Sequence, residues 1–195
     1  MAEAGRDRGV ELMLAFQAGD EAAFDEIVAL LSGRVFSLLR RLLGPGEPVE
    51  DLAQEAFLRL YRARASYQPR GKLSTFLYRI TYNLALNRIR DRSRRPEVGM
   101  PTGAEGEAID LADRRAEAPW AASDRRSWAE RIEAALARLP ENQRAALVLQ
   151  HYDGLDLEQI GGILGISAKA VKSLLHRART RMREILAPYR EAEHD

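Results

Sequence analysis

The sequence predicts an all-α protein of two small helical domains joined by a flexible linker, the second domain ending in a helix-turn-helix. Apolar residues recur at the spacing of amphipathic helices through most of the chain, and no alternating β-type run occurs. A segment at 96–124 lacks this periodicity and is rich in Gly, Pro and acidic residues. We therefore place the domains at 1–95 and 125–190 and the linker at 96–124.

The composition restricts the class of protein. With 195 residues, 46% of them hydrophobic, the chain can bury two small cores. It has no apolar stretch long enough to span a membrane and no signal-peptide core, so we expect a cytoplasmic protein without membrane insertion. With no Cys and three scattered His, we expect no disulfide, no metal site and no cofactor. The net charge is only +1, but the charges are segregated along the chain.

Residues 10–43 contain two helical patterns, separated at Gly19-Asp20 and ended by Gly44-Pro45-Gly46. A third helix is predicted from about Pro48. Its apolar stripe comprises Val49, Leu52, Ala53, Ala56, Phe57, Leu60 and Tyr61. The opposite face begins with Glu50, Asp51, Gln54 and Glu55, a pattern that by itself is typical of a solvated surface.

The charge then reverses. Residues 59–95 contain eleven Lys or Arg (59, 62, 64, 70, 72, 79, 88, 90, 92, 94 and 95) and one acid, Asp91. They include a loop at Ser66–Lys72 and a helix from Leu73 that is apolar on two sides. Leu73, Phe76, Leu77, Ile80 and Leu84 share one face, and Tyr78, Tyr82, Leu86 and Ile89 lie roughly opposite. Such a helix is either buried between two layers or offers one stripe to a partner.

Two interpretations of these tyrosines stay open at this stage. Aromatic rings among cations suit single-stranded nucleic acid, because bases stack on the rings while phosphates bind the cations. Alternatively, the tyrosines pack against the helix at 49–61. Asn87 falls on the core side of the helical wheel, so we expect a buried, hydrogen-bonded amide rather than a base-reading one.

The segment at Asp156–Arg183 predicts a helix-turn-helix. It follows helices around Trp128–Leu139 and from Pro140. Gly165 suits the end of its first helix, and Ser167 suits the N-cap of its second. The second helix has Val171, Leu174, Leu175, Ala178 and Met182 on one side and Lys169, Lys172, Ser173, His176 and Arg177 on the other.

Residues 167–183 contain six Lys or Arg (169, 172, 177, 179, 181 and 183) and no acid. A helix of this kind binds in the DNA major groove, whereas the plainer alternative is a helical hairpin with a solvated basic face. We interpret His176 as a polar member of this face, because no other His or Cys lies at metal-ligand spacing.

Five segments together resemble the bacterial RNA polymerase sigma factors of the extracytoplasmic-function (ECF) group, which consist of two domains that bind the minus-10 and minus-35 promoter elements. These segments are AGDEAAFDEIV (Ala18–Val28), VEDLAQEAFLRLYRA (Val49–Ala63), FLYRITYNLALNRIR (Phe76–Arg90), LPENQRAALVL (Leu139–Leu149) and VKSLLHRAR (Val171–Arg179). They cover nearly the whole chain outside the linker, and they occur in the family's order.

The resemblance implies a role for three sets of residues. The polymerase-docking set is Glu50, Asp51, Gln54, Glu55 and Leu58. The minus-10 binding and melting set is Tyr67, Arg70, Lys72, Tyr78, Arg79, Tyr82, Asn83, Arg88 and Arg90, with the Ser66–Lys72 loop as the reader of a flipped base. The minus-35 set is Ser167, Lys169, Lys172, Ser173, His176, Arg177 and Arg179.

The resemblance also implies a transcription initiation factor that is not itself an enzyme. Its expected partners are core RNA polymerase, through the clamp helices of the largest subunit and the flap of the second-largest subunit, promoter DNA, and an anti-sigma factor. The free protein is expected to be a monomer. The chain departs from the family at Phe76, where Trp is usual, at Asn87 (Asp), at Leu174 (Arg) and at Gly161 (Ala).

Two other classes of function are less consistent with the sequence. A stand-alone DNA-binding regulator would not need the docking helix at Val49–Ala63. A nuclease would need clustered carboxylates for metal ions, which the sequence lacks.

The linker carries a further expectation: about 28 residues span about 30 Å when relaxed and about 90 Å when stretched, so we expect domains that are uncoupled in the free protein.

Overall fold

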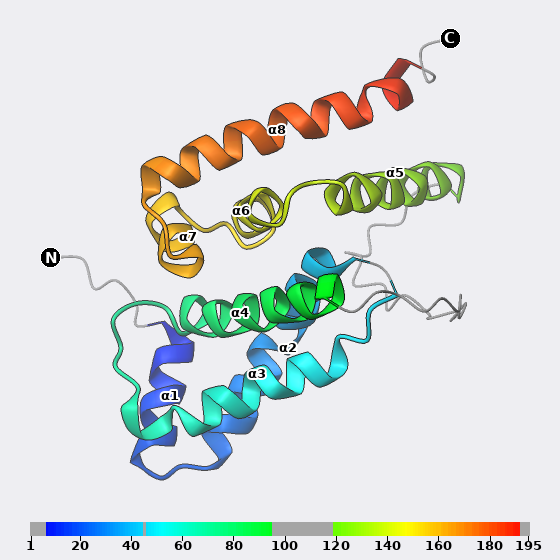
Figure 1. Ribbon diagram of the computed structural model, residues 1–195. Coiled ribbons are helices and arrows are strands. Elements are labelled where there is room, and N and C mark those ends of the chain that lie inside the picture. Colours follow the sequence, from blue (N-terminus) through cyan, green and yellow to red (C-terminus); the bar gives the residue numbers. More distant parts are fainter. Residues whose placement is uncertain (1–6, 45, 95–118, 192–195) are drawn as a thin grey trace, which may run out of the picture.

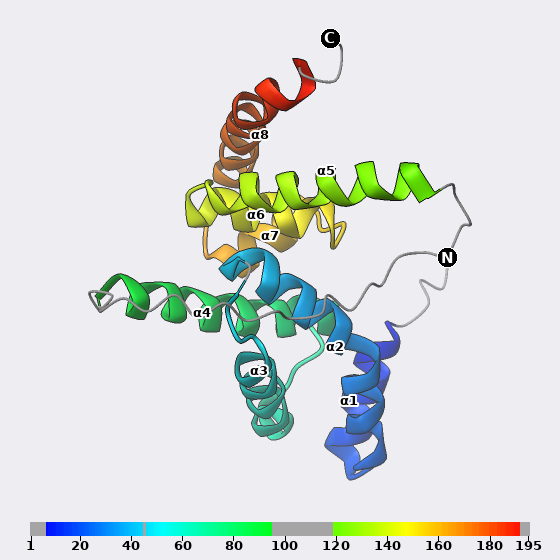
Figure 2. The ribbon, with the colours of Figure 1, turned by 90° about the vertical axis from the view of Figure 1, so that its right-hand side faces the viewer.

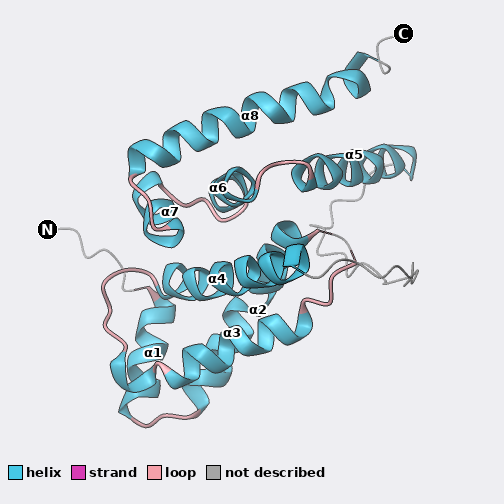
Figure 3. Cartoon of the chain, viewed as in Figure 1, coloured by secondary structure: helices cyan, strands magenta, loops and turns pink. Residues whose placement is uncertain are grey.

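The computed structural model describes residues 7–44, 46–94 and 119–191, and every regular element in these ranges is a helix (Figure 3). The all-α prediction is therefore confirmed. In chain order the elements are α1 (Arg8–Ala18), α2 (Ala22–Leu43), α3 (Glu50–Arg62), the 3-10 turn η1 (Arg64–Ser66), α4 (Leu73–Arg94), α5 (Pro119–Ala137), α6 (Glu141–His151), α7 (Leu157–Leu164) and α8 (Ala168–Glu191). None of the described helices is long and apolar enough to cross a membrane.

Most of the predicted linker lies outside the described residues. Only its last part is described, and there the chain is already helical, because α5 begins at Pro119. Residues 119–124, which we assigned to the linker, therefore belong to the first turns of α5. A proline is tolerated at the start of a helix because the first N–H groups have no intrahelical acceptor.

Helices α1 to α4 form one unit, which we call the N-terminal unit. Asp7 caps α1 by accepting a hydrogen bond from the Val10 amide, and Gly19 ends it in the left-handed conformation with φ of 113°. Helices α2, α3 and α4 then pack on one another around fully buried Ile27, Leu39 and Leu60. Helix α3, for which the resemblance implies a docking role, and the basic helix α4 thus pack on the same core.

Helices α5 to α8 form the C-terminal unit. Helix α8 packs on α5, α6 and α7, and its buried Val171 meets the small core of Leu149 and Ile160. Figure 1 shows α8 as a long rod, with α5 alongside it and the short α6 and α7 beneath its beginning. This arrangement leaves one side of α8 open to solvent.

The two units lie in contact, which differs from our expectation of uncoupled domains. Helix α4 packs on α2 and α3 on one side and on α7 on the other, and α2 also meets α5 and α6. The two perpendicular views agree on this layering (Figures 1 and 2). The length of the linker alone predicts that the two domains move independently. That estimate does not include the second buried face of α4, which contacts the C-terminal unit.

The double-sided pattern of α4 therefore reflects burial between two layers. Tyr78 is 1% exposed and Tyr82 is 4% exposed, and both hydroxyls donate hydrogen bonds to the C-terminal unit. The prediction for Asn87 is wrong, because its side chain is exposed. Leu86 and Ile89, on either side of Asn87, are half-buried against the core, so the exposed side of this last part of α4 includes Asn87.

Candidate nucleic-acid and polymerase interfaces

The first helix of the helix-turn-helix is fixed at both ends by local hydrogen bonds. The Asp156 carboxylate accepts from the Gln159 amide at 2.8 Å, and the Gln159 side chain accepts from the Asp156 amide at 3.1 Å. This reciprocal pair is a capping box. At the other end Gly165 is left-handed, with φ of 70°, as its position in the sequence predicted.

Gly161 permits the tight turn between α7 and α8. A Cβ atom built on it would lie 2.6 Å from the carbonyl oxygen of Ile166, a backbone atom that cannot move aside without shifting the turn. The turn therefore leaves no room for the Cβ atom of the Ala that the family usually has at this position. In this chain the turn comes closer to α7 than an alanine would allow.

Helix α8 begins as predicted. The Ser167 hydroxyl accepts a hydrogen bond from the Ala170 amide at 3.3 Å, so Ser167 acts as the N-cap. Val171, Leu175 and Ala178 are buried beneath the helix. The predicted minus-35 residues are all exposed: Ser167, Lys169, Lys172, Ser173, His176, Arg177 and Arg179. The helix thus presents a cationic face on an apolar base.

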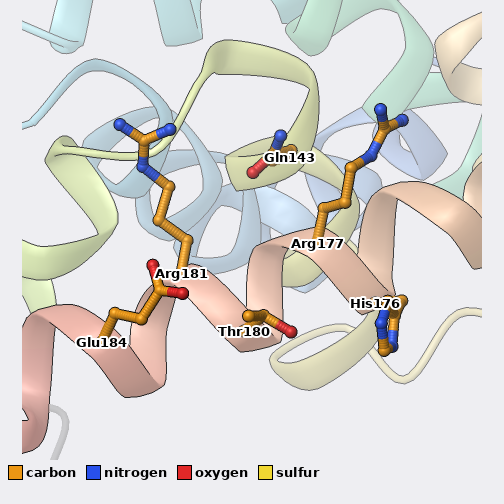
Figure 4. A pocket seen from close by; sticks show the side chains of 6 residues that line it. All are labelled: Gln143, His176, Arg177, Thr180, Arg181 and Glu184. Atoms are coloured by element: carbon orange, nitrogen blue, oxygen red, sulfur yellow. The ribbon is translucent and has the colours of Figure 1, made fainter.

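Two shallow hollows lie on this face of α8. One is lined by Lys172, Ser173, His176 and Arg177. The other is lined by Gln143, His176, Arg177, Thr180, Arg181 and Glu184. In Figure 4 the Arg177 and Arg181 side chains extend on either side of Gln143, which comes from α6. Guanidinium groups suit phosphate oxygens, and the Glu184 carboxylate lines the same hollow.

Four residues that line the second hollow were absent from our predicted site: Gln143, Thr180, Arg181 and Glu184. Arg181 could have been found, because it belongs to the same basic run as Arg177. Gln143 could not, because it lies 34 positions earlier than Arg177 and only the packing of α6 on α8 brings it to the site. Arg179, which was predicted, donates to the Gln150 side chain at 2.6 Å.

The predicted minus-10 residues fall into two groups. The cations and the amide are exposed: Arg70 and Lys72 on the loop, and Arg79, Asn83, Arg88 and Arg90 along α4. Among them, Arg79 lies over the Phe76 ring, 5.4 Å from its centre, and Arg88 pairs with Glu47 at 3.0 Å. These groups are available to a phosphate backbone.

The three predicted tyrosines are buried instead. Tyr67 is 5% exposed and packs edge-on against Phe76, and its hydroxyl has no hydrogen-bond partner within the described residues. Burial raises the pKa of the Tyr78 and Tyr82 phenols, and the nearby charges of Asp153 and Glu141, respectively, raise them further. The Tyr78 and Tyr82 phenols are therefore neutral, and each donates a hydrogen bond.

The predicted docking face lies on the exposed side of α3. Glu50, Asp51 and Gln54 are exposed, Glu55 pairs with Arg59 at 2.7 Å, and the Leu58 side chain is 42% exposed. The residues beneath them, such as Ala53, Ala56 and Leu60, are fully buried, which confirms most of the predicted stripe. Tyr61 is the exception: it is 41% exposed and lies against the rings of Phe16 and Phe24.

Comparison with known proteins matches the two units to two families. Residues 27–95 match Sigma-70 region 2, and residues 129–182 match Sigma-70, region 4. The chain is also 35% identical over 174 residues to the ECF RNA polymerase sigma factor SigW of Bacillus subtilis, covering 86% of this chain and 91% of that relative. The chain belongs to the ECF sigma factors.

Other relatives agree with this assignment. This sigma factor is 32% identical over 185 residues to the RNA polymerase sigma-H factor of Pseudomonas aeruginosa, covering 94% of this chain and 96% of that one. It is 38% identical over 174 residues to the ECF sigma factor SigE of Mycolicibacterium smegmatis, with 88% of this chain and 65% of that longer relative covered.

Two solved structures share the fold of this sigma factor. CnrH, in complex with the cytosolic domain of CnrY, superposes with a TM-score of 0.65 at 24% identity, covering 93% of this chain and 97% of that one. RpoE, in complex with the anti-sigma factor NepR from Bartonella quintana, superposes with a TM-score of 0.63 at 22% identity, covering 84% and 96%. The predicted pair of helical domains is thus a known arrangement.

Proposed function

We propose that this sigma factor binds core RNA polymerase, directs it to specific promoters and helps to open the minus-10 region, without being an enzyme itself. The observation that carries this proposal is the presence in one chain of an exposed acidic face on α3 and an exposed cationic face on α8. The relatives named above are RNA polymerase sigma factors. A DNA-binding regulator would need only the second face.

In this proposal, α8 reads minus-35 DNA in the major groove. The residues nearest its N-terminus, Ser167 and Lys169, lie where base edges and phosphates are contacted in helix-turn-helix complexes. Lys172, Ser173, His176 and Arg177 follow along the exposed face, and Arg179 extends it. Leu174, where the family usually has Arg, is half-buried against the core and so supplies no phosphate contact.

The N-terminal unit acts at the minus-10 element. Extruding a base costs a few kcal/mol, and cations along the displaced strand offset that cost. We assign this role to Arg70 and Lys72 of the loop and to Arg79, Asn83, Arg88 and Arg90 of α4. Tyr67, Tyr78 and Tyr82 complete this set, and their rings stack on bases only after the residues that bury them move away.

The acidic face of α3 docks on the clamp helices of the largest polymerase subunit, through Glu50, Asp51, Gln54, Glu55 and Leu58. An exposed leucine among carboxylates fits a protein partner, because buried apolar anchors supply binding energy and charges supply orientation. The C-terminal unit binds the flap of the second-largest subunit. The functional domains are 1–95 and 125–190, and the chain acts in the cytoplasm as a monomer until it binds polymerase.

An anti-sigma factor is a further expected partner, in line with the Bartonella quintana RpoE–NepR complex.

The test of the whole proposal is a nuclease footprint on promoter DNA across a salt series, with and without core polymerase. Free protein should protect DNA only weakly, with an affinity on the order of 10⁻⁴–10⁻⁶ M. Core enzyme should add protection of two elements and reactivity of unpaired minus-10 bases. A sharp two-element footprint from the free protein at physiological salt would identify a stand-alone regulator instead.

A further inference from the structure

The loop at Ser66–Lys72 is held at its beginning and open over the rest of its length. The resemblance implies that this loop reads a flipped minus-10 base. Residues 68–72 are all exposed, and an added Cβ at Gly71 would meet nothing within 4 Å. The direction in which this open part extends is therefore set where the chain leaves η1.

Gln17, in the last turn of α1, holds the chain at that point. Its side-chain amide nitrogen donates to the Arg64 carbonyl oxygen at 2.9 Å and to the Tyr67 carbonyl oxygen at 3.3 Å. A side-chain NH₂ group has two hydrogens, so it can serve both acceptors. Arg64 is the first residue of η1, and Tyr67 is the extended residue that follows it, with ψ of 134°. One side chain thus fixes the backbone on both sides of the bend.

The Arg64 side chain is held by the same part of the molecule. Its guanidinium pairs with the Glu21 carboxylate, just before α2, and lies over the Phe16 ring of α1, 4.4 Å from its centre. The Glu21 side chain is 62% exposed, so the ion pair contributes little by itself. The hydrogen bonds from Gln17 act on the backbone directly, and they are the contacts that set the direction of the loop.

We propose that Gln17 is a positioning residue for minus-10 base reading: by bridging the Arg64 and Tyr67 carbonyls, it holds the Ser66–Lys72 loop in the conformation that receives the extruded base. This inference rests on the proposed function of the N-terminal unit at the minus-10 element. Gln17 acts through the loop and not by touching DNA. It precedes residues 27–95, which match Sigma-70 region 2, so the role belongs to a helix outside that match.

The bridge from Gln17 acts on the choice of base and not on binding to the phosphate backbone. Arg79, Arg88 and Arg90 lie on α4, whose position does not depend on the direction of the loop. If the released loop occupies its reading conformation in one molecule in ten, the affinity for the preferred base falls about tenfold. The affinity for the other three bases, which the loop does not favour, should stay the same. A general loss of structure would instead weaken binding to every strand.

The binding test uses holoenzyme assembled from core polymerase and each full-length variant. It is titrated with short fluorescent single strands of the footprinted minus-10 sequence, in which each position carries each of the four bases in turn. Gln17→Ala removes both hydrogen bonds, and Gln17→Glu keeps the shape of the side chain but has a carboxylate, which cannot donate. Both should lower the base preference at one position about tenfold and leave the other positions unchanged. The control is Leu14→Ala, a truncation at an exposed position of the same helix.

The absence of Cys in the full chain allows the loop to be observed directly in the free protein. Gly71→Cys in the loop and Ala29→Cys, at an exposed position of α2, carry spin labels, and the distance between the labels is measured. The parent and Leu14→Ala should give one narrow distribution, and both Gln17 variants a broader one. Helical circular dichroism should be the same for all, which distinguishes a released loop from an unfolded unit.

Two outcomes would overturn this inference alone. One is a distance distribution in both Gln17 variants as narrow as that of the parent. The other is a released loop whose holoenzyme keeps the full base preference. Failure of the proposed function gives a different result: the parent holoenzyme would then prefer no base at any minus-10 position, and the inference that rests on that function would fall with it.

Discussion

At the scale of single residues, Gly161 and Gly162 give the sharpest comparison in the chain. They are neighbours in α7, but an added Cβ at Gly161 meets a backbone oxygen, whereas at Gly162 nothing lies within 4 Å. Gly161→Ala should destabilise the C-terminal unit by about 1–3 kcal/mol through overpacking. Gly162→Ala should stabilise it by about 0.5–1 kcal/mol, because alanine is the better helix former.

Chemical denaturation of each full-length variant, followed by helical circular dichroism, measures both changes. Gly161→Ala should also weaken duplex minus-35 binding, because the turn sets where α8 begins. Equal unfolding midpoints for the two alanine variants would contradict the tight approach at Gly161.

The cations of α8 make a second prediction at this scale. Replacing Lys172 by Ala should lower the affinity for all duplexes about equally, because one phosphate contact is lost. The slope of the logarithm of the binding constant against the logarithm of the salt concentration should become smaller in magnitude by about one. Replacing a residue that reads a base should cost about 1–3 kcal/mol and relax specificity at one position. Lys169 and Arg177 are tested in the same way, and Arg138→Ala, an exposed cation outside α8, is the control. Unaltered promoter-specific transcription from the variant with all three replaced would refute the recognition-helix role.

At the scale of elements, α3 is a docking helix by prediction. Asp51→Lys should weaken binding to core polymerase by reversing a charge at the centre of the exposed acidic face. Asp25→Lys, an equal reversal at an exposed position of α2, should not. Affinity is measured by competition for core enzyme with a labelled sigma factor, and circular dichroism should be unchanged for both. Equal affinities for the two variants would refute the docking assignment.

How far the sequence predicts an element is shown by comparing α8 with α4. Every local feature of the helix-turn-helix, including Gly165, Ser167 and the cationic face, follows from short-range chemistry and is present in the structure. Helix α4 depends on what packs against it. The pattern predicted two apolar faces, but nothing local to Tyr78 indicates a partner 75 positions away at Asp153.

The prediction for Asn87 is wrong for the same reason. Periodicity gives the face of the helix on which a residue lies, but not which positions of that face other helices cover. Of the site, the exposed cations and carboxylates were predictable from their patterns. Gln143 and the burial of the tyrosines required the tertiary contact between α6, α7 and their neighbours.

At the scale of the whole molecule, the contact between the N-terminal and C-terminal units should depend on pH. Burial raises the pKa of Asp153 above its ordinary value, and this outweighs the hydrogen bond from Tyr78 and the charges of Arg34 and Arg41, which lower it. Once the units separate, water restores the ordinary pKa. The state with the two units in contact therefore binds a proton more readily than the separated state. The added stability of the contact is fully present below the ordinary pKa of Asp153 and is lost as pH rises through the raised pKa.

Spin labels are placed on cysteines introduced at two exposed positions, Ala29→Cys of α2 and Ala187→Cys of α8. We expect the distribution of distances between these labels to narrow on acidification from neutral pH toward the raised pKa of Asp153. Asp153→Asn keeps a hydrogen-bond acceptor and cannot titrate, so it should abolish the change. The same pH response in the Asn variant would assign the effect to other groups and contradict this prediction.

The most direct measurement of the central claim, that this chain directs polymerase to promoters, is in vitro transcription of fragmented genomic DNA from its source organism by purified core polymerase, with start sites mapped by sequencing. Adding the chain should create a set of start sites that share two upstream elements. Asp51→Lys and the triple variant at Lys169, Lys172 and Arg177 should each remove that set. Start sites that are the same with and without the chain would contradict the account.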